Sequence, residues 1–259
     1  TIVIYFYEEY RDNNNKFLKL YSIFSLIFIL TSMNRYSGFG NDDPAHMLYL
    51  VAIFNFLKII YVPDNEKNLF FKKLTYYTVN TFLIKQFYIL ILILPILVYF
   101  IYLKKINLQN KCNLFSTILI SIWLLKNILV SGCVLYPANI SCFQSLNWSP
   151  NGTLSNPIKV SIESEAWAKA WPDRSDKSIG LSEHISDYQW IDAWLKSHLK
   201  VVLKKLSPLT ILSILFLIII IFTIKEKNKL PLKRLLITIF YLHIFFSLVW
   251  FFKFPTYRY

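Results

Sequence analysis

The residues best suited to chemistry lie in segment 38–46, a polar stretch between two strongly apolar segments. Asp42 and Asp43 are adjacent carboxylates, and His46 follows about one helical turn later. Carboxylates and imidazoles carry most proton transfer in enzymes. Ionisable side chains are costly beside a membrane and usually have a function there. We therefore predict that Asp42, Asp43 and His46 form a catalytic site; the alternative is a solvated turn at the bilayer surface.

A second group of chemically suited residues lies in segment 163–174. Glu163, Trp167 and Trp171 follow one another at helical spacing, so one helix face is predicted to carry an acid and two indoles. Lys169 and Arg174 lie close by in the sequence. Indole faces stack on sugar rings and also anchor proteins at the bilayer interface. Both interpretations stay open, and the concentration of charge and tryptophan favours a saccharide platform.

The cysteines suggest one covalent link. Cys133 and Cys142 are separated by eight residues with Pro137 near the middle. In an oxidising compartment this spacing favours a disulfide-closed hairpin over two reduced thiols. Cys112 is expected to be a small apolar filler.

The composition is that of a membrane protein. Of 259 residues, 55% are hydrophobic and 18% aromatic, and the mean hydropathy is +0.43. The net charge of +13 comes largely from lysines at the ends of apolar runs. That pattern indicates anionic membrane lipids as partners and argues against nucleic acid.

We expect an all-α polytopic membrane protein with about five complete transmembrane helices. The chain begins and ends as if it were a fragment of a longer protein, because segment 1–7 is apolar but too short to span. Two further segments are predicted to be amphipathic interfacial helices: 46–62, and 186–206 with a capping box formed by Ser186 and Gln189. The expected spans are 17–33, 87–103, 112–130, 208–224 and 235–252.

Charge decides the expected orientation. The short loops 104–111 and 225–234 are strongly basic and should be cytoplasmic, which places 131–207 outside. Loops on alternating sides of the membrane then require that segment 46–62 does not cross the bilayer. The predicted organisation is a membrane region at 1–130 with an acidic first outer loop at 34–86, an extracytoplasmic loop at 131–207, and C-terminal transmembrane helices at 208–259.

Segment 41–46, followed by the apolar helix at 47–62, resembles the GT-C class of integral-membrane glycosyltransferases. Segments 131–137, 167–174 and 250–259 are similar to those of bacterial multi-spanning proteins from surface-polysaccharide contexts. The resemblance implies transfer of a sugar from a polyprenyl-phosphate carrier to a cell-surface glycan or lipid acceptor, on the outer face of the bacterial inner membrane.

The resemblance also implies roles for the candidate residues. Asp43 or Asp42 would be the general base, and the other would orient it or hold a divalent cation such as Mg²⁺ or Mn²⁺. His46 would relay a proton or orient a phosphate. Cationic side chains, Arg258 first, would bind the lipid phosphate. The expected substrate-binding residues are Glu163, Trp167, Lys169, Trp171, Arg174, Lys253, Tyr257 and Arg258.

Three other functions remain open. A transporter or flippase of lipid-linked saccharides would use the same outward groups without reaction, and would carry ionisable residues within its spans. A polysaccharide polymerase would also be polytopic with a large outer loop. A non-catalytic membrane protein would use Asp42 and Asp43 only to cap a helix.

Overall fold

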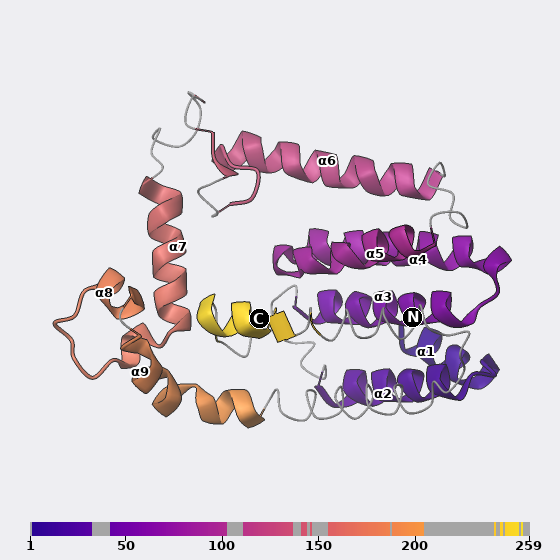
Figure 1. Ribbon diagram of the computed structural model, residues 1–259, viewed down its shortest axis with the longest axis horizontal. Coiled ribbons are helices and arrows are strands. Elements are labelled where there is room, and N and C mark those ends of the chain that lie inside the picture. The colour runs from indigo at the N-terminus through magenta and orange to yellow at the C-terminus, as the bar shows by residue number, and fades with distance from the viewer. Residues whose placement is uncertain are drawn as a thin grey trace. The chain divides into compact units, whose positions relative to one another are not determined.

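The computed structural model describes most of the chain, and the described part is helical throughout (Figure 1). Within it, the only extended pairing is an isolated antiparallel bridge between Cys133 and Cys142. The all-α class is therefore confirmed for this part. The described residues are 2–32, 42–102, 111–136, 141–143, 146, 155–186, 188–204, 241, 244–245, 247–253 and 255.

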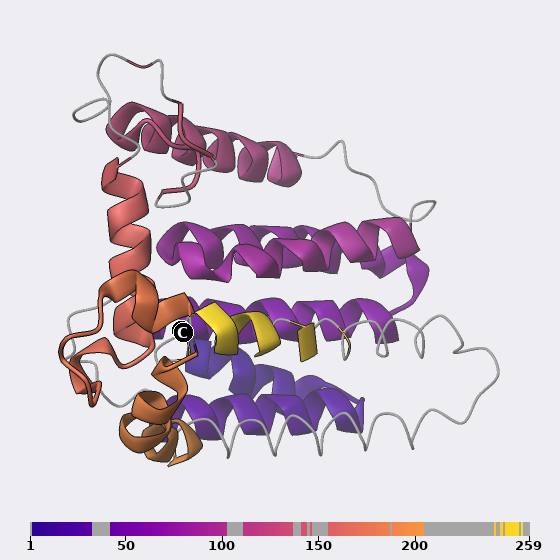
Figure 2. The ribbon, with the colours of Figure 1, turned by 60° about the vertical axis from the view of Figure 1, so that its left-hand side comes forward.

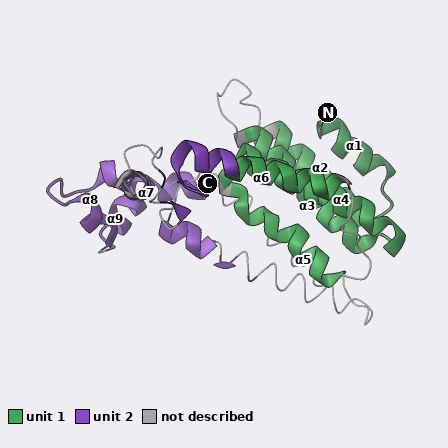
Figure 3. Cartoon of the chain, turned by 90° about the horizontal axis from the view of Figure 1, so that it is seen from above, with its two compact units in different colours: residues 1–124 green, residues 125–259 purple. Residues whose placement is uncertain are grey.

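The chain divides into two compact units, Thr1–Leu124 and Leu125–Tyr259, which are coloured separately in Figure 3. Helix α6 (Lys111–Ser131) contributes residues to both units.

Unit 1 is built from two pairs of packed helices. The long helices α3 and α4 run side by side, and α1 packs along α2 (Figures 1 and 2). Helix α4 follows Pro63, whose fixed φ suits a helix start, and acidic residues in its first turn favour the helix dipole. The bounds are α1 Ile2–Asp12, α2 Lys16–Ser32, α3 Asp42–Tyr61, α4 Asp64–Ile84, η1 Gln86–Leu92 and α5 Ile93–Ile101.

Segment 34–86, expected to be an outer loop, therefore consists largely of α3 and α4. The sequence of α4 does not show a clear apolar face, because its first apolar residues, 69–71, stand between charged residues on both sides. Packing against α3 supplies the stabilisation that the local pattern does not show.

The helices of unit 1 enclose several polar side chains together with their apolar core, and they expose many apolar side chains. Hydroxyl and amide groups are enclosed, while long aliphatic side chains point outward. This distribution suits a lipid surrounding, in which polar groups must find partners inside the protein. The buried polar residues include Ser22, Ser25, Asn55, Thr78, Thr81 and Ser116, and the exposed apolar ones Leu20, Ile27, Leu30, Ile96, Phe100, Leu114, Ile118 and Ile122.

Among the described residues, two helices are long and apolar enough to cross a membrane, Asp43–Tyr61 and Cys112–Ser131. The second is covered by protein over only 17% of its most apolar window, so most of its surface needs another apolar environment. These helices indicate membrane association. The second coincides with the expected span 112–130, whereas five spans are not observed.

The remaining expected spans have different outcomes. Helix α2, Lys16–Ser32, covers residues 17–32 of the expected span 17–33 and has 17 residues. The expected helix at 87–103 is interrupted: η1 is a 3-10 segment with a kink at Tyr88, and only the following α5 is α-helical. Segment 208–224 lies outside the described residues, as does half of 235–252. That 46–62 lies along the membrane stays a prediction, since α3 passes the test of length and composition for a crossing.

Unit 2 contains short helices around a small aromatic core. Its bounds are α7 Ser155–Ala168, η4 Trp171–Asp173, α8 Leu181–Ser186 and α9 Trp190–Ser197, with further helical residues at 199–204 and 247–253. Trp190 and Trp194 of α9 are fully buried, and Phe251 packs on both rings at centroid distances of 5.4 Å. The core therefore joins segments that are distant in the sequence.

The predicted capping box at the start of the 186–206 helix is wrong. Ser186 is the last residue of α8, and its hydroxyl donates to the Glu183 carbonyl at 3.2 Å. Tyr188 then has a left-handed φ of 55°, which no α-helix tolerates in its interior. Helix α9 begins only at Trp190, whose indole is buried in the core.

Candidate functional site

The acidic stretch lies at the N-terminal end of α3. Asp42 is the first residue of this helix, and its side chain falls outside the described part of the structure. Asp43 is half-buried, and His46 lies on the same helix face at the i+3 position. The His46 ring packs edge-on against Tyr88 of η1 at 5.7 Å, and Tyr49 contacts the same tyrosine at 5.5 Å.

This geometry gives the site a polar end and an aromatic side. The first turn of a helix favours negative charge, because its free N–H groups and the helix dipole point there. Tyr88 fixes one side of the imidazole, so the ring has a defined orientation. Asp43 and His46 therefore share one side of the first turn of α3.

A complete metal centre is not visible among the described residues, where no three or more His, Cys, Asp or Glu side chains come together. A divalent cation at Asp42 and Asp43 would need further ligands.

The predicted helix face of Glu163, Trp167 and Trp171 is wrong in its last member. Helix α7 ends at Ala168, and Ala170 takes a left-handed φ of 60°. That conformation ends helices, so Trp171 lies in the separate turn η4. Glu163 and Trp167 do remain one turn apart on α7, and Trp167 is 64% exposed.

Arg174 and Trp171 are brought together, and their contacts stabilise the turn that holds them. The guanidinium lies 3.6 Å above the indole ring. Its two terminal nitrogens donate to the carbonyls of Trp171 and Lys177 at 3.0 and 3.1 Å. The other contact of the indole is the His184 ring, edge-on at 5.2 Å. The Nε–H of Arg174 is buried and makes no hydrogen bond to the described residues, so this donor is unused within the turn.

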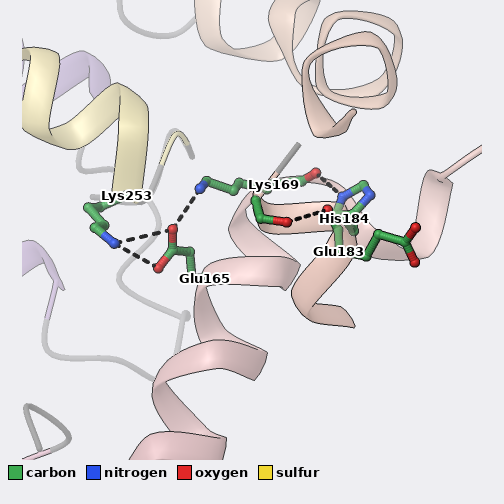
Figure 4. A network of polar contacts seen from close by, with 6 residues as sticks. Glu165, Lys169, Glu183, His184 and Lys253 are labelled. Atoms are coloured by element: carbon green, nitrogen blue, oxygen red, sulfur yellow. Dashed lines mark hydrogen bonds and ion pairs between the residues drawn. The ribbon is translucent and has the colours of Figure 1, made fainter. Parts of the chain in front are cut away.

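The strongest charged cluster of unit 2 centres on Glu165, which the sequence analysis did not select (Figure 4). Its carboxylate accepts hydrogen bonds from Lys169 Nζ at 2.6 Å and from Lys253 Nζ at 3.1 and 3.5 Å. The side chain of Glu165 is 13% exposed and that of Lys169 only 5%. The Lys169 ammonium also lies 5.0 Å from the Trp190 ring centroid.

His184 contacts this cluster through the backbone of Lys169. Its Nε2 lies 3.0 Å from the backbone carbonyl of Lys169, so this nitrogen carries the proton and donates. The ring is 1% exposed. The sequence offered a signal for Glu165, since it precedes Lys169 by the i, i+4 spacing of helix ion pairs. No comparable signal pointed to His184.

The predicted disulfide between Cys133 and Cys142 is present in the structure. Its hairpin is closed further by backbone bonds from Val134 to Ser141 at 2.9 Å and from Phe143 to Gly132 at 2.8 Å. Gly132 has a φ of 69°, where glycine is favoured, and so lets the chain turn as it leaves α6.

Unit 1 also contains an enclosed ion pair, which the sequence did not indicate. Glu9 of α1 and Lys58 of α3 approach to 2.7 Å, with side chains 15% and 14% exposed. The ammonium lies 4.7 Å from the Phe70 ring centroid. Nearby on α3, Asn55 is fully buried; it donates to the Tyr5 hydroxyl at 3.4 Å, and its Oδ1 has no hydrogen-bond partner.

The predicted site residues thus form separate groups. Asp43 and His46 belong to unit 1, and the others that the structure describes belong to unit 2. Within unit 2, Lys169 and Lys253 meet at Glu165, whereas Trp171 and Arg174 form their own stack. Tyr257 and Arg258 lie outside the described residues.

These observations define an all-helical protein with apolar helices of membrane type, an acidic helix start and a tryptophan-rich second unit. The whole chain, residues 1–259, matches the family described as a domain of unknown function, DUF8201, and the protein belongs to that family. No curated protein and no solved structure matches the chain.

Proposed function

We propose that this protein is a membrane glycosyltransferase of the GT-C type. In this proposal it crosses the bacterial inner membrane several times and has its active face outside. It moves a sugar from a polyprenyl-phosphate carrier to a hydroxyl group of a cell-surface glycan or lipid. The observation that supports the proposal most is the geometry at the start of α3, where Asp43 and His46 lie one turn apart at the end of an apolar helix.

The proposed chemistry requires only one proton transfer. Asp43 accepts the proton of the acceptor hydroxyl while that oxygen attacks the anomeric carbon of the sugar. The bond from the anomeric carbon to the phosphate oxygen breaks, and the polyprenyl phosphate leaves with the electron pair. His46, oriented by Tyr88, either relays the proton or donates to a phosphate oxygen. Asp42 is proposed to orient Asp43 or to hold a divalent cation.

The test is an assay of sugar transfer in membranes that contain the full-length protein. Radiolabelled sugars carried on polyprenyl phosphate are supplied, and the label in the acceptor fraction is measured. Asp43→Asn is expected to reduce transfer about a hundredfold or more, the usual contribution of a general base. Asp192→Asn is the matched control, because Asp192 is an exposed carboxylate that pairs with Lys196 at 2.6 Å. Full activity in both Asp42→Asn and Asp43→Asn would exclude this catalytic centre.

A second candidate is a transporter or flippase of lipid-linked saccharides, and one observation favours it. Glu9 and Lys58 form an enclosed ion pair against α3, a helix of membrane-spanning length. Charges in such positions often mark a transport path. A flippase would translocate the labelled lipid-linked sugar across vesicles without transfer to an acceptor, and Glu9→Gln would reduce that translocation while Asp43→Asn would not.

A further inference from the structure

The cluster at Glu165 contains two lysines that differ sharply in accessibility. The Lys169 side chain is 5% exposed and sits beneath the Trp190 ring, whereas the Lys253 side chain is 60% exposed. Both donate to the same carboxylate, as Figure 4 shows. Lys169 is therefore a fixed partner of Glu165, and Lys253 is a partner that water and solutes can reach.

The charges of these three side chains do not cancel. Two ammonium groups share one carboxylate, which leaves one positive charge in excess. If Lys253 leaves, Glu165 keeps its 2.6 Å bond to Lys169, so no carboxylate is left buried without a partner. Separation of Lys253 therefore breaks only a partly exposed ion pair, the weakest kind in a folded protein.

The backbone on both sides of Lys253 is held in place. Phe251 packs on Trp190 and Trp194, and the Trp194 indole N–H donates to the carbonyl of Pro255. The Lys253 side chain can consequently turn from one partner to another by rotation about its own bonds. No movement of the surrounding segment is needed.

We propose that Glu165 is the resting partner of Lys253, and that Lys253 exchanges this carboxylate for a phosphate group of a ligand. Glu165 is then a positioning residue: it holds the ammonium beside the site and competes with the incoming phosphate. This inference concerns unit 2 alone and rests on the proposed function only for the class of ligand, a lipid-linked phosphate. It is tested by binding alone and does not require catalysis.

The experiment measures binding of farnesyl phosphate, a short carrier analogue, and of inorganic phosphate to the purified full-length protein. Lys253→Met is expected to weaken farnesyl phosphate binding about fivefold, because one charge contact at about 4 Å in a water-like dielectric is lost. Removal of the competing carboxylate is expected to tighten binding by a similar factor. That removal uses the double substitution Glu165→Gln with Lys169→Met, so that no buried ammonium is left unpaired. Asp192→Asn is the control and should change neither affinity.

The direction of the change distinguishes this proposal from a purely structural role. A structural role predicts equal or weaker binding in the double variant, and that result in a folded protein would overturn the exchange. An unchanged affinity in Lys253→Met would overturn it as well, and this exposed position can be replaced whether or not the double variant folds. Equal effects on both probes would assign the site to any phosphate, and effects on farnesyl phosphate alone to the lipid-linked form. Loss of transfer in Asp43→Asn with unchanged binding would keep the two proposals separate.

Discussion

The two partners of the enclosed ion pair of unit 2, Glu165 and Lys169, should differ in how much their replacement destabilises the protein. Glu165→Gln removes the negative charge and leaves the Lys169 ammonium, 5% exposed, without a counter-charge and 5.0 Å from the Trp190 ring centroid. Breaking a buried pair in this way costs about 3–5 kcal/mol of unfolding free energy. Lys169→Met leaves the carboxylate bound to Lys253 at 3.1 Å, so we expect a smaller loss of about 1–2 kcal/mol. The double substitution should be close to neutral, because no buried charge remains unpaired.

Thermal unfolding of the detergent-purified protein, followed by tryptophan fluorescence, measures these differences. The wild type, the two single variants and the double variant form a double-mutant cycle, and the pair's coupling energy is expected to reach about 2 kcal/mol or more. Asp192→Asn, which breaks an exposed pair on α9, should change stability by less than about 1 kcal/mol. If Lys169→Met destabilises the protein as much as Glu165→Gln does, then Lys253 does not compensate the carboxylate and the reasoning fails.

Two further predictions concern the turns of unit 2. Cys133→Ser should lower the unfolding free energy by about 2–4 kcal/mol, because the disulfide restricts a short loop in the unfolded chain; thermal unfolding with and without reductant measures this, and an equal midpoint would contradict it. The hydroxyl and the backbone N–H of Ser178 both donate hydrogen bonds to the Asp176 carboxylate. The hydroxyl has the larger effect, and together they lower the pKa of that carboxyl below its ordinary 3.8. The associated stabilisation is present above that value and is lost as the pH falls through the lowered pKa. Ser178→Ala should raise the pKa of Asp176 towards 3.8, and an unchanged NMR titration of the carboxyl carbon would refute this.

The helical class was predictable because composition and period are local properties of the sequence. The interruptions were less predictable, because contacts between distant segments determine them. The apolar pattern of 87–103 contains nothing that distinguishes η1 from an α-helix, and the kink at Tyr88 coincides with its packing against His46. The break at Tyr188 similarly depends on burial of Trp190 in a core completed by Phe251.

The candidate site shows the same division between local and distant information. Two helix pairings were equally visible in the sequence: Glu163 with Trp167, and Glu165 with Lys169. The choice between them depends on which side of α7 faces Trp190, and only the folded chain decides that. The structure encloses Glu165 and leaves Trp167 exposed. Glu163 and Trp167 therefore lie on the surface of α7, whereas Glu165 and Lys169 form an enclosed ion pair.

The same contacts reorder the cations proposed to bind a lipid phosphate. Arg174 was one of three cations expected to bind the phosphate, and its two terminal nitrogens already bind backbone carbonyls while its plane covers an indole. Its Nε–H makes no hydrogen bond within the described part of the chain but is buried, so a phosphate would reach this donor only if the turn after α7 opened. Lys253 needs to give up one partly exposed ion pair, and its former partner remains bound to Lys169. Among the described cations of the predicted site, Lys253 therefore reaches a phosphate at the lowest cost in free energy, although its geometry is the less specific of the two.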